Sequence, residues 1–270
     1  MIRAPAWTDW EEIGRDLKWH PARSIWRTYC DGLNRNWLEK QLPGHRLQAA
    51  LKTDAFDEAV GDGVYPSLRR AAERVYAMDI SLSTCRLAIN RWPRLTAAVS
   101  DVRNLPFGDD SFDLILSLST LDHFASISEI EAALGCLCRV LRPGGCLLLT
   151  LDNLSNPFVR FRNSLPRRFL QSFGLVPYPV GITLRPGQLR ELLERTGFEV
   201  RDLRALMHVP RAPAVALAGL FDKVGGSLAG RIFCRVHLWF ELLSKLPTWR
   251  WTGNYIAVSC CKGNRTLRSK

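Results

Sequence analysis

The chain has 270 residues, of which 47% are apolar and 23% charged, a composition that excludes a wholly disordered chain and allows a full core. Its net charge of +11 arises in the second half, because residues 1–135 carry 16 Lys and Arg against 19 Asp and Glu, and residues 136–270 carry 21 against 7. No apolar run reaches the ~20 residues of a membrane-spanning helix and no secretory signal is visible, so we expect a cytoplasmic protein, with peripheral membrane contact left open.

Residues 1–50 have a helical pattern rich in tryptophan, and we expect them to form an N-terminal cap. From residue 51 short apolar runs alternate with helical stretches, which predicts an α/β domain over residues 51–270 with a Rossmann-like, doubly wound, mostly parallel sheet of seven strands. The expected strands are Ala55–Val60, Arg74–Ile80, Leu95–Ser100, Phe112–Leu118, Gly145–Leu151, Glu199–Val209 and Tyr255–Cys261. The expected helices are Pro66–Glu73, Ser83–Asn90, Ile127–Val140 and Pro186–Thr196. Residues 152–184 and 210–251 are long for connections and are expected to be functional insertions.

A series of polar and glycine residues follows the ends of these expected strands. The first is the turn Asp57-Glu58-Ala59-Val60-Gly61-Asp62-Gly63, where glycines would let a ligand approach the backbone. Asp79 ends the next strand, where a carboxylate can accept ribose hydroxyls. Further on come the segments Asp101–Phe112 and Val140–Gly145.

In this order, D-x-A-x-G-x-G, a strand-end Asp, D-V-x-x-L-P-F-x-D-x-S-F-D-L-I and V-L-R-P-G-G, the sequence resembles the class I S-adenosylmethionine-dependent methyltransferases, in particular their type 11-like domains. Ala59 departs from the pattern, since a glycine usually stands there. The resemblance implies S-adenosylmethionine as cofactor, bound by Asp57, Gly61 and Gly63 at its methionine end. It further implies roles in cofactor binding for Asp79, Ile80, Asp101, Val102, Ser117 and Ser119.

Methyl transfer to oxygen usually needs a base, and three residues after strand ends are candidates for the catalytic machinery. His123 follows the fourth strand, Asp152 ends the fifth and could orient a hydroxyl, and His208 ends the sixth. A structural role remains open for both histidines. No metal is expected, because the position before Asp122-His123 that could complete a ligand set is Ser119, and the eight cysteines have no zinc-like spacing.

The basic second half suggests a small-molecule substrate with anionic or lipid-linked character. Arg160, Arg162, Arg167 and Arg168 of the first insertion could bind phosphate or carboxylate, or could form a solvated basic face. Residues 228–246 contain an apolar stripe flanked by Arg231, Arg235 and Lys245. Such a helix either lies on an anionic membrane or packs on its own domain.

The function predicted from these features is methyl transfer to a small molecule, to oxygen on a lipid-linked, glycan or polyketide-like acceptor. Two alternatives stay open. A nucleic-acid methyltransferase would suit the basic half, although residues 117–122 contain no motif for a flipped base, which argues against nucleic acid as a partner. A Rossmann-like protein that binds without catalysis would explain Ala59.

Overall fold

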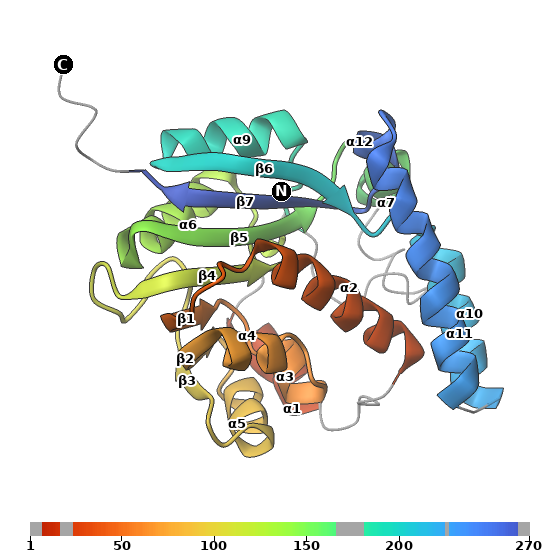
Figure 1. Cartoon of the computed structure of the whole chain (residues 1–270), viewed down its shortest axis with the longest axis horizontal. Coiled ribbons are helices and arrows are strands. Elements are labelled where there is room, and N and C mark those ends of the chain that lie inside the picture. Colours follow the sequence, from red (N-terminus) through yellow and green to blue (C-terminus); the bar gives the residue numbers. More distant parts are fainter. Residues whose placement is uncertain (1–6, 17–23, 166–180, 225–226, 264–270) are drawn as a thin grey trace.

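The computed structural model describes residues 7–16, 24–165, 181–224 and 227–263. Its sheet has seven strands in the order β3-β2-β1-β4-β5-β7-β6, with β7 antiparallel to both neighbours and the other pairs parallel (Figure 1). The strands are β1 (Leu47–Lys52), β2 (Ala72–Asp79), β3 (Thr96–Val99), β4 (Phe112–Leu118), β5 (Leu141–Asp152), β6 (Phe198–Leu206) and β7 (Tyr255–Lys262). The α/β class and the mostly parallel seven-stranded sheet expected from the sequence are therefore confirmed.

Helices cover both faces of this sheet. Strand residues alternate between two cores: Leu147, Leu149 and Leu151 of β5 pack with α6 and α9, and Leu148 packs on the opposite face with α2 and α4. The helices that line the sheet are α2 (Ile25–Gln41), α3 (Phe56–Val60), α4 (Tyr65–Ala71), α5 (Leu82–Arg91), α6 (Ile127–Val140) and α9 (Pro186–Arg195).

The first predicted strand is wrong. Residues 56–60 form the short helix α3, and β1 lies earlier, at Leu47–Lys52, paired with β2 and β4. The predicted boundary between cap and domain at residue 50 therefore falls inside a strand. Burial of Lys52 at the end of β1 hid this strand, because a lysine normally marks a solvent-exposed position.

The remaining helices gather beyond the carboxyl ends of the parallel strands (Figure 1). The N-terminal segment contains α1 (Trp7–Asp16), which packs against α5. The first predicted insertion contains α7 (Pro157–Ser164), and Arg167 and Arg168 lie outside the described residues. The second contains α10 (Arg211–Val224), α11 (Ser227–Leu238), the 3-10 helix η3 (Trp239–Lys245) and α12 (Trp249–Thr252). None of the described helices is long and apolar enough to span a membrane.

Candidate active site

A cavity of about 1470 Å³ opens at the carboxyl ends of the parallel strands, the edge where open α/β sheets bind ligands. One small ligand usually occupies roughly 300–1000 Å³, so this cavity has room for a cofactor and an acceptor together. Its walls come from the ends of β1, β2, β4 and β5, from α1 and α2, and from α7, α10 and η3.

The turn after β1 forms one wall of this cavity and contains no glycine. Four of its residues line the cavity: Thr53, Asp54, Phe56 and Asp57. Behind them the ammonium group of Lys52, whose side chain is 1% exposed, lies 2.6 Å from Asp54 Oδ1 and 2.9 Å from Glu58 Oε2. Burial raises the pKa of Glu58 to about 7, although Lys52 opposes this shift. The buried ion pairs thus hold the turn between β1 and α3.

Gly61 and Gly63, expected to bind the cofactor, do not line the cavity. They lie beyond α3, where the Gly63 amide donates to Asp31 at 3.2 Å. Gly63 has a φ of +53°, and a Cβ there would come within 2.3 Å of Glu58 Oε1. Gly63 therefore allows the chain to pack closely on Glu58, whereas a Cβ at Gly61 would be nearest to Arg27 and Asp31.

Asp79 lies at the end of β2 and lines the cavity together with Ile80. Its Oδ2 accepts a hydrogen bond from the Ala55 amide at 3.0 Å, and its Oδ1 accepts one from the Ser81 amide at 2.9 Å. Burial raises the pKa of Asp79 to about 6, against these two hydrogen bonds. Each oxygen keeps a lone pair for another donor, as the predicted ribose contact requires.

Asp101 and Val102 also line the cavity, on the far side of Asp79. The Asp101 carboxylate is held by Arg103, whose Nε lies 3.0 Å from Asp101 Oδ1. Although burial raises the pKa of Asp101, the Arg103 hydrogen bonds lower it below its usual value. Arg103 was missed at the sequence level, though its place two residues after Asp101 is a local signal.

At the end of β4, Ser119 lines the cavity with a φ of +51°, a conformation unusual outside glycine. Met207, after β6, has a φ of +59° and also lines the cavity. Backbone strain of this kind concentrates at functional sites. Ser117, also expected to bind the cofactor, is fully buried, accepts a hydrogen bond from the Thr53 hydroxyl at 3.0 Å and does not line the cavity.

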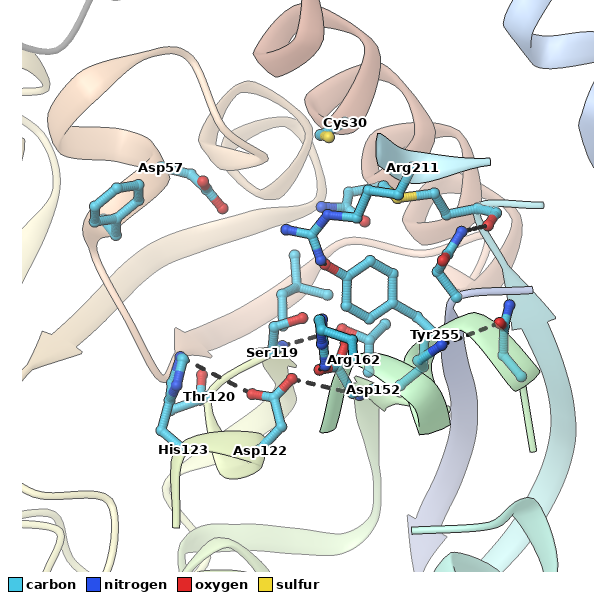
Figure 2. Close-up of a pocket in the computed structure, with 18 of the residues that line it drawn as sticks. Cys30, Asp57, Ser119, Thr120, Asp122, His123, Asp152, Arg162, Arg211 and Tyr255 are labelled. Atoms are coloured by element: carbon cyan, nitrogen blue, oxygen red, sulfur yellow. Dashed lines mark hydrogen bonds and ion pairs between the residues drawn. The ribbon is translucent and has the colours of Figure 1, made fainter. Parts of the chain in front are cut away.

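The three predicted catalytic residues all line the cavity but differ in their surroundings. His123 contacts the Trp10 ring at 4.7 Å between centroids, and its Nε2 lies 3.9 Å from Asp122 Oδ1. Asp152 forms an ion pair with Arg162 (Figure 2). His208 has both ring nitrogens engaged, with Nδ1 2.7 Å from Thr252 Oγ1 and Nε2 3.2 Å from the Ala205 carbonyl.

The cavity wall near α10 contains a hydrogen-bonded pair that the sequence did not reveal. Arg211, the first residue of α10, donates to the Tyr255 hydroxyl at 3.1 Å, and both line the cavity beside Arg162 (Figure 2). The residues lie 44 positions apart, so only the tertiary fold brings them together. Within the described part of the chain, no group of His, Cys, Asp and Glu side chains is arranged to hold a metal ion.

Known proteins share this architecture and part of this sequence. A family model described as a methyltransferase domain matches residues 57–149. A probable S-adenosylmethionine-dependent methyltransferase of Mycolicibacterium smegmatis is 29% identical over 65% of this chain and 61% of its own length. A ubiquinone/menaquinone biosynthesis C-methyltransferase of Dinoroseobacter shibae is 31% identical over 56% of this chain and 60% of its own. The chain thus spans about three fifths of these two relatives.

The fold has a close match in a putative methyltransferase of Haloferax volcanii, solved with its activator Trm112. The TM-score is 0.58 at 15% identity, over 98% of this chain and all of the other, which shows a shared fold. The Mycolicibacterium smegmatis relative is named for its dependence on S-adenosylmethionine, which is the cofactor expected from the sequence. Residues 57–149 thus match a methyltransferase domain, and they lie within a seven-stranded sheet whose fold this chain shares with a solved methyltransferase.

Proposed function

We propose that the protein transfers a methyl group from S-adenosylmethionine to a small-molecule acceptor bound in the same cavity. The observation that carries this proposal is the continuity of the cavity from Asp79 to the polar cluster around Arg211 and Tyr255. Displacement at a sulfonium methyl mainly requires alignment of two bound molecules, and one cavity with room for both provides it.

S-adenosylmethionine supplies an electrophilic methyl group, and the residues around Asp79 fit its binding. Asp79 would accept the ribose hydroxyls, while Ile80, Asp101 and Val102 would contact the adenine. Asp54 and Asp57 line the turn after β1 and offer negative charge to the cofactor's ammonium and sulfonium groups. Ser119 would lie at the methionine end.

Arg27 fits the carboxylate of the same cofactor, a role that sequence reasoning did not assign. It extends from α2 into the cavity, where its Nη1 lies 2.9 Å from Asp57 Oδ1. Its guanidinium also lies over the Phe56 ring at 5.1 Å. The remaining donors of this side chain can bind a carboxylate, so the N-terminal helices contribute to the cofactor site.

His123 is the proposed general base for an oxygen acceptor. Its side chain is 28% exposed and lines the cavity, and Asp122 lies beside it, with Oδ1 3.9 Å from the ring Nε2. Asp152 is proposed to position Arg162 rather than to accept a proton, because the two are ion-paired. His208 is proposed to hold the end of β6 against α12, since both its ring nitrogens are engaged.

The acceptor is proposed to combine an anionic group with an apolar body. Arg211 has the neutral hydroxyl of Tyr255 as its hydrogen-bond partner, so it can bind a phosphate or carboxylate. Apolar side chains make up much of the wall near α7, α10 and η3. The relative named for quinone biosynthesis is consistent with such an acceptor. These features favour a lipid-linked acceptor over a glycan.

Calorimetric titration with S-adenosylhomocysteine tests the cofactor site without knowledge of the acceptor. We expect one binding site, and we expect Asp79→Asn to weaken binding about 10–100-fold, since hydrogen bonds to charged groups contribute roughly 1.5–3 kcal/mol. Asp62→Asn is the matched control, because Asp62 is exposed and lies outside the cavity. Equal affinities for the two variants, or no binding at millimolar ligand, contradict the proposal.

A further inference from the structure

Exposed apolar side chains are concentrated on one part of the molecule. Of the eighteen large hydrophobic residues described as exposed, fourteen belong to α7 or to residues 211–251. Trp239 is 71% exposed, Leu228 62% and Leu242 60%, while Phe158 on α7 is 75% exposed. Exposed apolar side chains that are concentrated on one part of a protein in this way often mark an interaction site.

Packing within the domain accounts for only one face of this region. Ala214, Ala218, Phe233 and His237 are buried and face α2 through a cluster that includes Tyr29. On α11 a second row, Leu228, Ile232 and Val236, recurs every four residues and remains exposed. The single stripe expected over residues 228–246 is thus divided between two faces, and the helix ends at Leu238.

Basic side chains lie beside the exposed apolar row. Arg231 and Arg235 follow the same four-residue spacing as Ile232 and Val236, and both are exposed. Lys223, Lys245 and Arg250 are exposed on the neighbouring elements. Across the described residues, no salt bridge involves any of these five cations.

The two carboxylates of residues 211–251 are engaged within the fold and do not balance these cations. Asp222 Oδ1 accepts the amide of Ile25 at 2.9 Å, and Glu241 Oε1 accepts the amide of His208 at 2.9 Å. The outer surface therefore presents apolar groups and uncompensated positive charge together. Amphipathic helices that bind anionic membranes have this combination.

The same surface surrounds the entrance of the cavity. Phe158, Phe161, Val215, Phe240 and Trp251 are exposed, and each also lines the cavity. Figure 1 shows α10 and α11 side by side at the end of the sheet where the parallel strands terminate. The exposed apolar surface is therefore continuous with the lining of the cavity that contains Arg211.

We propose that the exposed face of α7, α10, α11 and η3, hereafter the basic arm, binds an anionic lipid bilayer with the mouth of the cavity turned toward the lipid. The apolar row and Trp239 enter the interfacial region, and Arg231 and Arg235 contact lipid phosphates. The acceptor is then a membrane amphiphile whose anionic head reaches Arg211. This last step rests on the proposed methyl transfer, whereas membrane binding does not.

Sedimentation of the 270-residue chain with vesicles tests this proposal. One set contains phosphatidylcholine alone, and the other contains one quarter phosphatidylglycerol. We expect binding to the anionic vesicles, little binding to the neutral ones, and weaker binding in high salt, because the attraction is screened. Each basic residue near an anionic surface contributes about fivefold to binding, so Arg231→Glu with Arg235→Glu should weaken binding by more than about tenfold.

Two comparisons make the result specific to the basic arm. Arg86→Glu with Arg94→Glu changes the net charge equally at exposed positions elsewhere, and this variant should bind like the unmodified protein. Trp239→Ser tests the apolar contribution and should also weaken binding. Absence of wild-type binding to anionic vesicles, or equal loss in both charge variants, overturns the proposal.

A second copy of this chain is the other occupant that the measurement must exclude. Light scattering of wild type and of Trp239→Ser decides this, because a dimer lost in the variant would assign the arm to self-association and overturn membrane binding.

Titration with S-adenosylhomocysteine separates the two proposals. Vesicle binding can fail while cofactor binding persists, and loss of cofactor binding alone would contradict the methyltransferase function without affecting the arm.

Discussion

Replacement of Lys52 tests whether buried charge organises the turn that lines the cofactor half of the cavity. Lys52→Met removes the cation between Asp54 and Glu58 and leaves both carboxylates without it. Loss of one partner of a buried ion pair typically costs about 3–5 kcal/mol, a large part of a typical stability of roughly 5–15 kcal/mol. We therefore expect a folded but strongly destabilised protein, whereas Lys40→Met, at an exposed position, should change stability by less than about 0.5 kcal/mol.

The pH dependence gives this prediction a sign. Burial already raises the pKa of Glu58 to about 7, so Glu58 favours folding while it is protonated, and this contribution is lost as the pH rises through the folded-state pKa. Removal of Lys52 raises that pKa further. The destabilisation should therefore be greater at about pH 7.5 than at about pH 5.5, and Lys52→Met with Glu58→Gln should recover part of it.

Urea unfolding followed by circular dichroism at both pH values measures these differences. A destabilisation below about 1 kcal/mol, or one that is larger at the lower pH, would refute the account of Lys52 as the charge that holds the turn. Titration with S-adenosylhomocysteine in the same variant should show weaker binding, because Thr53, Asp54 and Asp57 lose a fixed position. Unchanged affinity would mean that the turn is organised independently of Lys52.

Two further predictions concern the cofactor half of the cavity. Affinity for S-adenosylhomocysteine should fall as the pH drops through about 6, where Asp79 takes up a proton and loses acceptors for the ribose, and calorimetry should show this dependence in the wild type but not in Asp79→Asn. Gly63→Ala should destabilise the fold by about 1–3 kcal/mol, because φ is +53° and the new Cβ would meet Glu58. Gly135→Ala is the control, because a Cβ there enters open space on α6 and should stabilise the fold slightly. Equal urea midpoints for the two variants would contradict this prediction.

Much of the sheet could be predicted because most of its strands are short apolar runs that are recognisable without knowledge of distant residues. The predicted bounds of one strand and one helix equal the observed bounds of β4 (Phe112–Leu118) and α6 (Ile127–Val140). The apolar run and the helical repeat each end at polar or turn residues, which mark the ends of the element. Asp79 and Asp101 were found in the same way, as carboxylates directly after strands. Such signals require only a few neighbouring residues.

The first strand and its turn could not be predicted because their stability depends on distant partners. Lys52 is acceptable in the core only when Asp54 and Glu58 fold back on it, and this arrangement has no local signature. The glycines at 61 and 63 indicated a ligand loop, but the groups packed closest to them belong to the protein: Arg27 and Asp31 at Gly61, and Glu58 at Gly63. The glycine pattern therefore predicted close packing correctly, but it predicted the wrong contact partner.

Most residues of the proposed acceptor half of the cavity could not be predicted either, because they come from distant parts of the chain. Arg211 and Tyr255 lie on separate elements, and Trp10 reaches His123 from the N-terminal helix. Pairs separated by tens or a hundred residues leave no spacing pattern in one sequence. For His208 the local sequence was misleading, because its position after a strand suggested a catalytic role. In the fold both of its ring nitrogens make hydrogen bonds, with the Thr252 hydroxyl and the Ala205 carbonyl.

A crystal structure of the protein with S-adenosylhomocysteine is the most direct test of the proposed cofactor site, because it shows where the ligand lies relative to the turn between β1 and α3. We expect the ribose hydroxyls on Asp79, the adenine between Ile80 and Val102, and the methionine end beside Asp57 and Ser119. A ligand placed against Gly61 and Gly63 instead, or absent from the cavity at saturating concentration, would contradict it.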